Sequence, residues 1–168
     1  KELIQNQYNE DADYKFLLDV RKYADEKVGK LEFPEELLKR FMKEQNADKG
    51  EEFVENNFAQ SLEELKWHLI KEKLVAKAEV KIDDADVRAA AVKTARFQFA
   101  QYGMNNVPEE YLENYAAELL KDRNQVNGFV ERSINEKLAK ALKEVVTLEH
   151  KSVSVEDFQK LFQDETAE

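Results

Sequence analysis

The chain has 168 residues, of which 37% are charged, and carries a formal net charge of -10. This balance excludes a nucleic-acid surface built from clustered Lys and Arg, and the lack of cysteine excludes disulfides and thiolate metal sites. No run of about 18 apolar residues could span a membrane, and no signal peptide opens the chain, so we expect a cytoplasmic protein. Only four Gly and two Pro occur among many Ala, Leu, Glu and Lys, which predicts an all-α fold.

The mean hydropathy of -0.73 indicates much polar surface for the buried volume, so we expect an elongated multi-helix body with projecting arms. The chain begins without Met, on a segment with a helical pattern, which indicates a fragment of a longer protein. We treat residues 1–168 as a single domain.

The first predicted helix runs from about residue 3 to residue 28 and ends at Gly29 in a left-handed cap. Pro34 and two following glutamates suit a helix start, and this second helix is expected to reach about Asn46. A polar loop up to Gly50 precedes a long helix predicted over 51–77, with a possible break near Gln60.

The stretch 61–82 is expected to organise the other helices because it carries two apolar stripes. One stripe contains Leu62, Leu65, Leu69, Ala76 and Val80, and the other contains Trp67, Ile70, Leu74 and Ala78. Lys66, Lys73 and Lys77 lie between the stripes, where their stems can cover apolar surface while the ammonium groups stay in water. This pattern predicts a solvent-lined groove.

A further helix is predicted from the N-cap Asp83, with Asp86 at the capping-box position, to Gly103. Its alanines at 89–91 should pack against a neighbouring helix, whereas at least one of Phe99, Tyr102 and Met104 should stay exposed. Helices over about 109–122 and 124–145 follow, then a short extended piece over 147–153 and a terminal helix capped by Ser154.

Two sequence echoes suggest an internal duplication of about 34–87 and 108–158. FPEELL matches VPEEYL around the only two prolines, and EVKIDDADV is similar to EHKSVSVEDF. Capping chemistry that recurs by chance is the alternative explanation.

The sequence offers no catalytic constellation, no metal site and no cofactor motif. His68 and His150 lie far apart and in no metal-binding pattern, the aspartates at 83, 84 and 86 fit an N-cap, and Ser133 has no neighbouring His.

Apolar side chains on a charged helical body are the remaining candidates for function. Such side chains are more often core than binding surface, but aromatic and Met residues near helix ends suit adaptable binding of other chains. The candidate client-binding residues are Phe41, Met42, Phe53, Phe58, Phe97, Phe99, Tyr102 and Met104.

SLEELKWHLIKEKLVAKAEVKIDDADV, over residues 61–87, resembles the C-terminal substrate-binding domain of bacterial trigger factor, a ribosome-associated chaperone. FPEELL at Phe33, QYG at Gln101, VPEEYL at Val107 and KSVSVEDFQKLF from Lys151 are similar to the same domain in its Bacteroidetes branch, in the same order.

The resemblance implies an all-α body with two arms that hold nascent or unfolded polypeptides, and that forms homodimers in some members. Ribosome docking and prolyl isomerisation belong to other domains of the full-length family, so the resemblance implies neither for this chain, nor any catalytic residue. It therefore favours an ATP-independent chaperone module. The alternative is a structural helical module that binds one specific protein partner.

Overall fold

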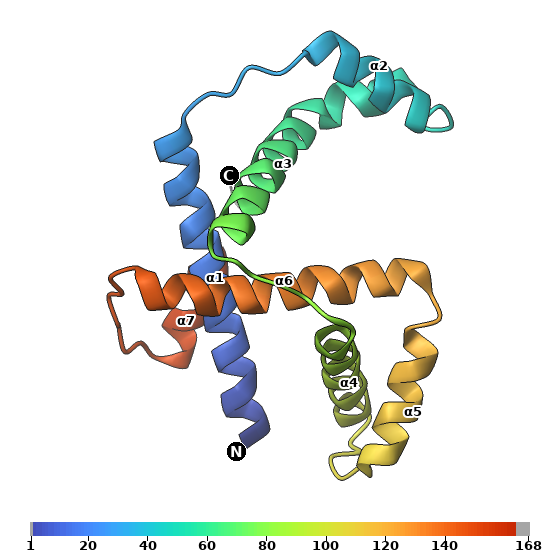
Figure 1. Cartoon of the computed structure of the whole chain (residues 1–168), viewed down its shortest axis with the longest axis vertical. Helices are drawn as coiled ribbons and strands as arrows, with labels where there is room; N and C mark the ends of the chain where they lie inside the picture. Colours follow the sequence, from blue (N-terminus) through green and yellow to red (C-terminus); the bar gives the residue numbers. More distant parts are fainter. Residues whose placement is uncertain (1, 164–168) are drawn as a thin grey trace. The chain divides into compact units, whose positions relative to one another are not determined.

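The computed structural model describes residues 2–163, and this part of the chain contains seven α-helices and no strand (Figure 1). The predicted all-α class is therefore confirmed. The helices are α1 (Glu2–Val28), α2 (Glu35–Gln45), α3 (Glu51–Lys77), α4 (Asp84–Gln101), α5 (Glu109–Leu119), α6 (Arg123–Val145) and α7 (Val155–Gln163).

Local chemistry at the helix ends agrees with the sequence patterns. Gly29 has φ +68°, and its amide donates to the carbonyl of Asp25 at 2.9 Å, which closes α1 with a left-handed cap. At the start of α4, Asp83 and Asp86 form the predicted capping box, each accepting from the other's backbone amide. The Ser154 hydroxyl accepts from the Asp157 amide at 3.1 Å, as expected for an N-cap.

The predicted helical stripe over 61–82 is too long at its C-terminal end. α3 is unbroken through residue 60 but ends at Lys77, and Glu79 then adopts a left-handed φ of +52°. Ala78 and Val80 therefore belong to the connection to α4, not to an apolar stripe of α3. The expected extended piece over 147–153 forms no strand.

The described chain forms two compact units. The hairpin unit is Leu18–Lys77 and contains the second half of α1 with α2 and α3. The core unit contains the first half of α1, up to Leu17, and the chain from Ala78 onward with α4 to α7.

In the core unit, α4 packs against both α5 and α6 (Figure 1). Ala91, Ala95 and Ala116 are fully buried where the helices meet, and Leu112 and Phe129 fill the space beside them. Alanine adds no bulk beyond Cβ, so the backbones can approach closely, and the expectation that alanines 89–91 pack on a neighbour holds for Ala90 and Ala91.

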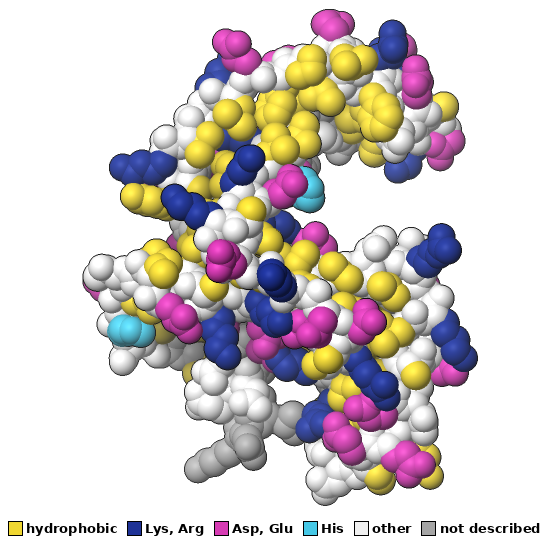
Figure 2. Space-filling model, in the orientation of Figure 1, with side chains coloured by type: hydrophobic (Ala, Val, Ile, Leu, Met, Phe, Trp, Pro, Cys, Tyr) yellow, Lys and Arg dark blue, Asp and Glu magenta, His cyan; other side chains and the backbone are white. Residues whose placement is uncertain are grey.

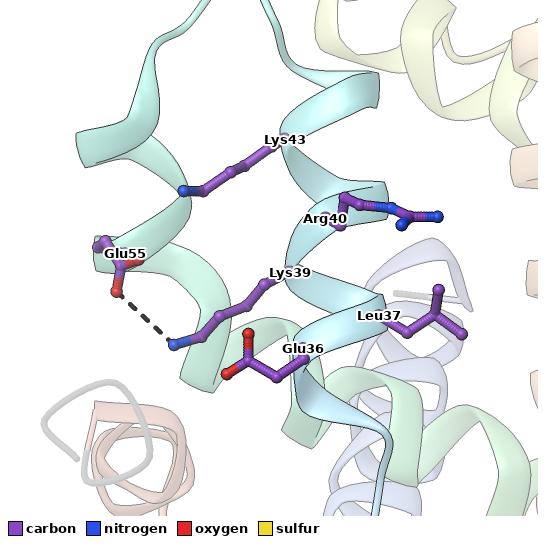
Figure 3. A pocket seen from close by; sticks show the side chains of 6 residues that line it. All are labelled: Glu36, Leu37, Lys39, Arg40, Lys43 and Glu55. Carbon is purple, nitrogen blue, oxygen red and sulfur yellow. Dashed lines mark ion pairs between the residues drawn. The ribbon is translucent and has the colours of Figure 1, made fainter.

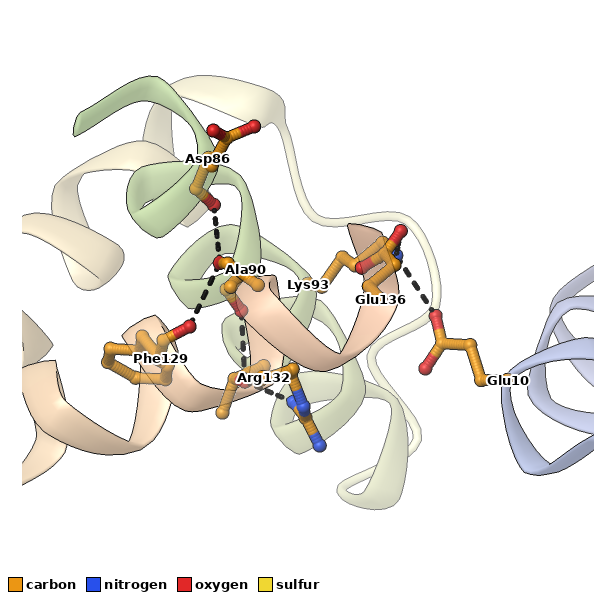
Figure 4. A network of polar contacts seen from close by, with 9 residues as sticks. Glu10, Asp86, Ala90, Lys93, Phe129, Arg132 and Glu136 are labelled. Carbon is orange, nitrogen blue, oxygen red and sulfur yellow. Dashed lines mark hydrogen bonds and ion pairs between the residues drawn. The ribbon is translucent and has the colours of Figure 1, made fainter. Parts of the chain in front are cut away.

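Polar contacts join α4 to α6 across the same interface (Figure 4). The buried Ser133 hydroxyl lies 2.9 Å from the carbonyl oxygen of Phe129 and 3.2 Å from that of Asp86, so it has a partner whichever way its proton points. Arg132 donates to the hydroxyl of Thr94 at 2.8 Å. The interface is therefore specified by hydrogen bonds as well as by packing.

In the core unit, aromatic contacts also hold α7 against α1. Phe158 of α7 meets Tyr8 of α1 edge to face at a centroid distance of 5.8 Å, and Phe162 stacks on Tyr14 at 6.4 Å. A helix as short as α7 is marginal alone in water, so these ring contacts explain why it forms.

The hairpin unit buries little by comparison. Val54 and Phe58 of α3 are buried, whereas Trp67 is half-buried with the Arg21 guanidinium 5.8 Å from its ring. Replacing Trp67 with Ala should therefore cost less than the roughly 3–5 kcal/mol typical of a fully buried Trp. Lys66 departs from expectation, because it is 7% exposed and forms an ion pair with Asp25 of α1 instead of projecting into water.

Candidate functional site

An apolar groove runs between α2 and α3 in the hairpin unit. Its volume is about 280 Å³, near the lower end of the size range of ligand pockets. The lining consists mainly of aliphatic, Phe and Met side chains: Leu38, Phe41 and Met42 from α2, and Phe58, Leu62 and Leu65 from α3, with Gln45, Asn46 and Ser61 at polar positions. In Figure 2, hydrophobic atoms gather on the surface over these two helices.

The helical pitch explains why α2 lines a groove instead of closing it. Leu38 and Met42 lie one turn apart and are half-buried against α3, whereas Leu37 and Phe41 lie on the next row around α2 and are 55% and 57% exposed. No residue of α2 is buried. Only part of the apolar face of α2 therefore contacts α3.

The other flank of α2 is charged. Lys43 pairs with Glu51 of α3 at 3.0 Å, and Lys39 pairs with Glu55 of α3 at 3.8 Å (Figure 3). The hydrogen bond from Lys43 to Glu51 and the charge of that carboxylate raise the pKa of Lys43 above its ordinary value, which is the direction expected for a paired ammonium group. The Lys39 ammonium also lies 5.0 Å from the centre of the Phe58 ring, which connects this flank to the groove.

A second apolar surface lies at the end of α4 in the core unit. One hollow of about 410 Å³ is lined by Gln98, Phe99, Gln101, Tyr102 and Tyr115. Another of about 620 Å³ is lined by Phe99, Met104, Val107, Pro108 and Tyr111, together with Gly103 and the two asparagines at 105 and 106. Phe99 belongs to both, so we call these residues together the α4–α5 tip.

The C-terminal cap of α4 positions the tip. Gly103 has φ +79°, and its amide donates to Ala100 at 2.9 Å while the Met104 amide donates to Phe99 at 3.0 Å. This pair of bonds is a Schellman motif, in which the residue after the glycine commonly packs against the helix it terminates. The cap thereby places Met104 beside Phe99 in one hollow.

The structure brings some of the eight predicted residues together and separates others. Phe41, Met42 and Phe58 share the α2–α3 groove, although Phe58 is only 7% exposed and forms its floor. Phe99, Tyr102 and Met104 share the α4–α5 tip.

The remaining two predicted residues, Phe53 and Phe97, line neither surface. Phe53 is half-buried with the Lys49 ammonium 4.6 Å from its ring, and Phe97 is exposed.

The expectation of exposed side chains near the end of α4 is confirmed. Tyr102 is 80% exposed and Met104 is 48% exposed. Phe99 differs, because it is half-buried, packs against the core of the unit and meets the Tyr115 ring edge to face at 5.3 Å. Its replacement would therefore disturb packing as well as surface.

Sequence reasoning missed the tyrosines of α5. Tyr111 and Tyr115 are spaced i, i+4 and so share one face of the helix, a signal that could have placed them beside the end of α4. The sequence pattern places Leu62 and Leu65 on an apolar stripe but contains no signal for their partners in α2. The Tyr115 hydroxyl donates to the side-chain oxygen of Gln98 at 3.0 Å, and this bond holds the Gln98 side chain at the tip.

The residues considered for metal binding serve the fold instead. Asp86 accepts a hydrogen bond from Lys137 at 2.6 Å in addition to its capping role, and these bonds, the one from Lys137 first, lower its pKa below the ordinary value. Within residues 2–163, no group of three or more His, Asp or Glu is arranged to hold a metal ion. No helix in that range is long and apolar enough to cross a membrane.

Comparison with known proteins gives one family match. No curated protein and no solved structure matches the chain. Residues 12–162, which include parts of all seven helices, match the family described as "Probable trigger factor, C-terminal domain". The seven-helix, strand-free architecture over residues 2–163 agrees with that family, and the chain belongs to it.

Proposed function

We propose that this chain is a chaperone module that binds non-native polypeptides, without nucleotide, through the α2–α3 groove and the α4–α5 tip. The observation that carries the proposal is the exposure of large apolar side chains that line hollows in both units. Phe41 in the groove and Tyr102 and Met104 at the tip are the principal examples.

The physical basis is weak contact at more than one place. Each exposed apolar anchor is worth at most a few kcal/mol when a client side chain covers it, so one contact forms and breaks readily. Two surfaces on one chain raise the overall affinity when one polypeptide can reach both. Release then needs no hydrolysis step.

The main test uses a panel of unrelated proteins that aggregate on dilution from denaturant. The wild-type chain should suppress their aggregation, and Phe41→Ser combined with Tyr102→Ser should weaken the suppression. Tyr23→Ser is a matched control, because Tyr23 is 63% exposed and lines neither surface. If no member of the panel is protected and one specific folded partner binds instead, the chain is a structural interaction module.

We also propose that the chain acts by binding alone, without prolyl isomerase activity. The family match covers the C-terminal domain, and no residue constellation in the described chain suggests catalysis of bond rotation. A protease-coupled assay with a proline peptide should give the uncatalysed rate. Catalysis that co-purifies with the chain would contradict this expectation.

A further inference from the structure

We propose that the Lys43–Glu51 and Lys39–Glu55 pairs are positioning elements that set the rotation of α2 about its own axis and thereby hold the α2–α3 groove open. This inference rests on the proposed function of the groove. It concerns residues outside the apolar lining of the groove.

The distribution of side chains around α2 supports this role. Leu38 and Met42 face α3, and the two lysines lie on one side of that contact. Phe41 lies on the other side, in the groove, whereas Leu37, one turn before it, borders the hollow that Lys39, Arg40 and Lys43 line. In Figure 3, the side chains of Lys39 and Lys43 reach toward α3, whereas those of Leu37 and Arg40 point to the opposite side. The ion pairs therefore anchor only one flank of the helix.

Burial of apolar surface alone would favour a different rotation of α2, with Leu37 and Phe41 turned toward α3. Leu37 and Phe41 are both more than half exposed, and turning them toward Leu62 and Leu65 would remove apolar surface from water. The same rotation would pull the lysines away from their carboxylates on α3 and fill the groove with the protein's own side chains. The ion pairs oppose this self-burial.

The balance between the two effects is close. Exposed ion pairs contribute little each, and covering two half-exposed side chains contributes a comparable amount. No residue of α2 is fully buried, so the half-buried Leu38 and Met42 hold its rotation only weakly. Breaking the pairs should therefore be sufficient to shift α2, without unfolding α3.

The test uses thiol labelling, for which the absence of native cysteine leaves a clean background. Leu37→Cys reports whether this row of α2 faces solvent. Lys39→Gln with Lys43→Gln should slow labelling about two- to tenfold, because the reporter turns toward α3. Faster labelling would mean that α2 detaches, and unchanged labelling would mean that the pairs do not set its rotation. Either result overturns the proposal.

Replacing the two glutamates instead of the two lysines provides the decisive comparison. Removing lysines near a thiol raises its pKa and could slow labelling by electrostatics alone. Glu51→Gln with Glu55→Gln breaks the same pairs with the opposite electrostatic effect, and labelling should still slow. If the lysine variant slows labelling and the glutamate variant accelerates it, the effect is only electrostatic and the proposal fails.

Two further variants serve as controls. Arg40→Gln removes a positive charge near the thiol without breaking either pair, because Arg40 pairs with Glu44 in the same helix at 3.7 Å, so this variant measures the electrostatic effect alone and should slow labelling less than the double lysine variant. Lys43→Arg keeps the pair and should behave as wild type. Adding about 1 M salt, which shortens the screening length to about 3 Å, should slow labelling of wild type but not of the double lysine variant.

Client binding is a separate readout. A reduced, carboxymethylated protein that stays unfolded should bind the lysine and glutamate variants about two- to tenfold more weakly than wild type. If wild type binds no unfolded protein, the proposed function fails, but the labelling experiment still decides the role of the pairs. If the labelling shifts as expected while binding is unchanged, the pairs set α2 rotation without controlling the groove, and this inference is wrong.

Discussion

α4 and α2 both pack against neighbouring helices, but they make contact in different ways. α4 buries Ala90, Ala91, Val92 and Ala95 against two helices, and its polar groups add hydrogen bonds to α6. α2 buries no residue and adds two exposed ion pairs to α3. The comparison indicates a rigid packed unit that carries a surface at its end, and a loosely held helix that is itself part of a surface.

The largest expected effect tests the packing of the core formed by α4, α5 and α6. Leu112→Ala should lower the free energy of unfolding by about 2–5 kcal/mol, because Leu112 is 2% exposed in the core of α4, α5 and α6. Leu37→Ala in α2 removes the same atoms from an exposed position and should change stability by about 0.5 kcal/mol or less. Chemical denaturation of both variants measures the difference. Similar losses would show that α2 is as tightly packed as the core formed by α4, α5 and α6.

Overpacking should be the next largest effect. Ala95 is fully buried in α4, so Ala95→Leu forces the neighbouring helices apart and should cost about 1–3 kcal/mol. Ala89→Leu is the matched change on the exposed face of the same helix and should be nearly neutral. Melting temperatures of the two variants distinguish them, and equal melting temperatures would contradict close packing at Ala95.

The sequence was sufficient to predict the helices because their ends depend on nearby residues. Gly29, Asp83 and Ser154 each act on a backbone group within a few positions, so the pattern and the structure agree there. Phe58 and Phe99 were harder to assign, because an aromatic residue has the same periodicity in a core and on a surface. Their burial depends on distant partners, such as Tyr115 beside Phe99.

Lys66 was misjudged for the same reason. Its position between two apolar stripes predicted an ammonium group in water, but the carboxylate of Asp25 comes from another helix, forty-one positions earlier in the chain. Periodicity within one helix contains no information on such a partner. The groove was partly predictable, since the stripe through Leu62 and Leu65 was visible, whereas the rotation of α2 that leaves Phe41 open was not.

The cap that positions the α4–α5 tip offers a test of intermediate size. Gly103→Ala should cost about 1 kcal/mol, because residue 103 has φ +79° and an L-residue pays a steric penalty there. No atom lies within 4 Å of a Cβ added at this position, so the cost comes from the backbone and not from crowding. Thermal unfolding measures it. An unchanged melting temperature would show that the Schellman motif contributes little.

Acid should weaken the cap at the start of α4. The folded-state pKa of Asp86 is lowered, first by its hydrogen bond from Lys137, so its contribution to stability is present above the unfolded pKa of about 4 and is lost as pH falls through the folded value. Asp86→Asn should therefore flatten the decline of urea stability below about pH 4 relative to wild type. Parallel acid profiles for the two proteins would exclude Asp86 as a source of that decline.

The smallest expected change in stability separates surface from core at the tip. Tyr102 is 80% exposed, so Tyr102→Ser should change the free energy of unfolding by no more than about 0.5 kcal/mol, whereas Phe99→Ser should cost more because Phe99 packs on the core and on Tyr115. Protection of an aggregating client should nevertheless fall in the Tyr102 variant, since its ring lines the hollow that Phe99 supports. Measured at a temperature where both variants are folded, equal protection by Tyr102→Ser and wild type would remove this side chain from the binding surface. If only Phe99→Ser weakens client protection, the tip contributes to that protection through its packing and not through the exposed Tyr102 ring.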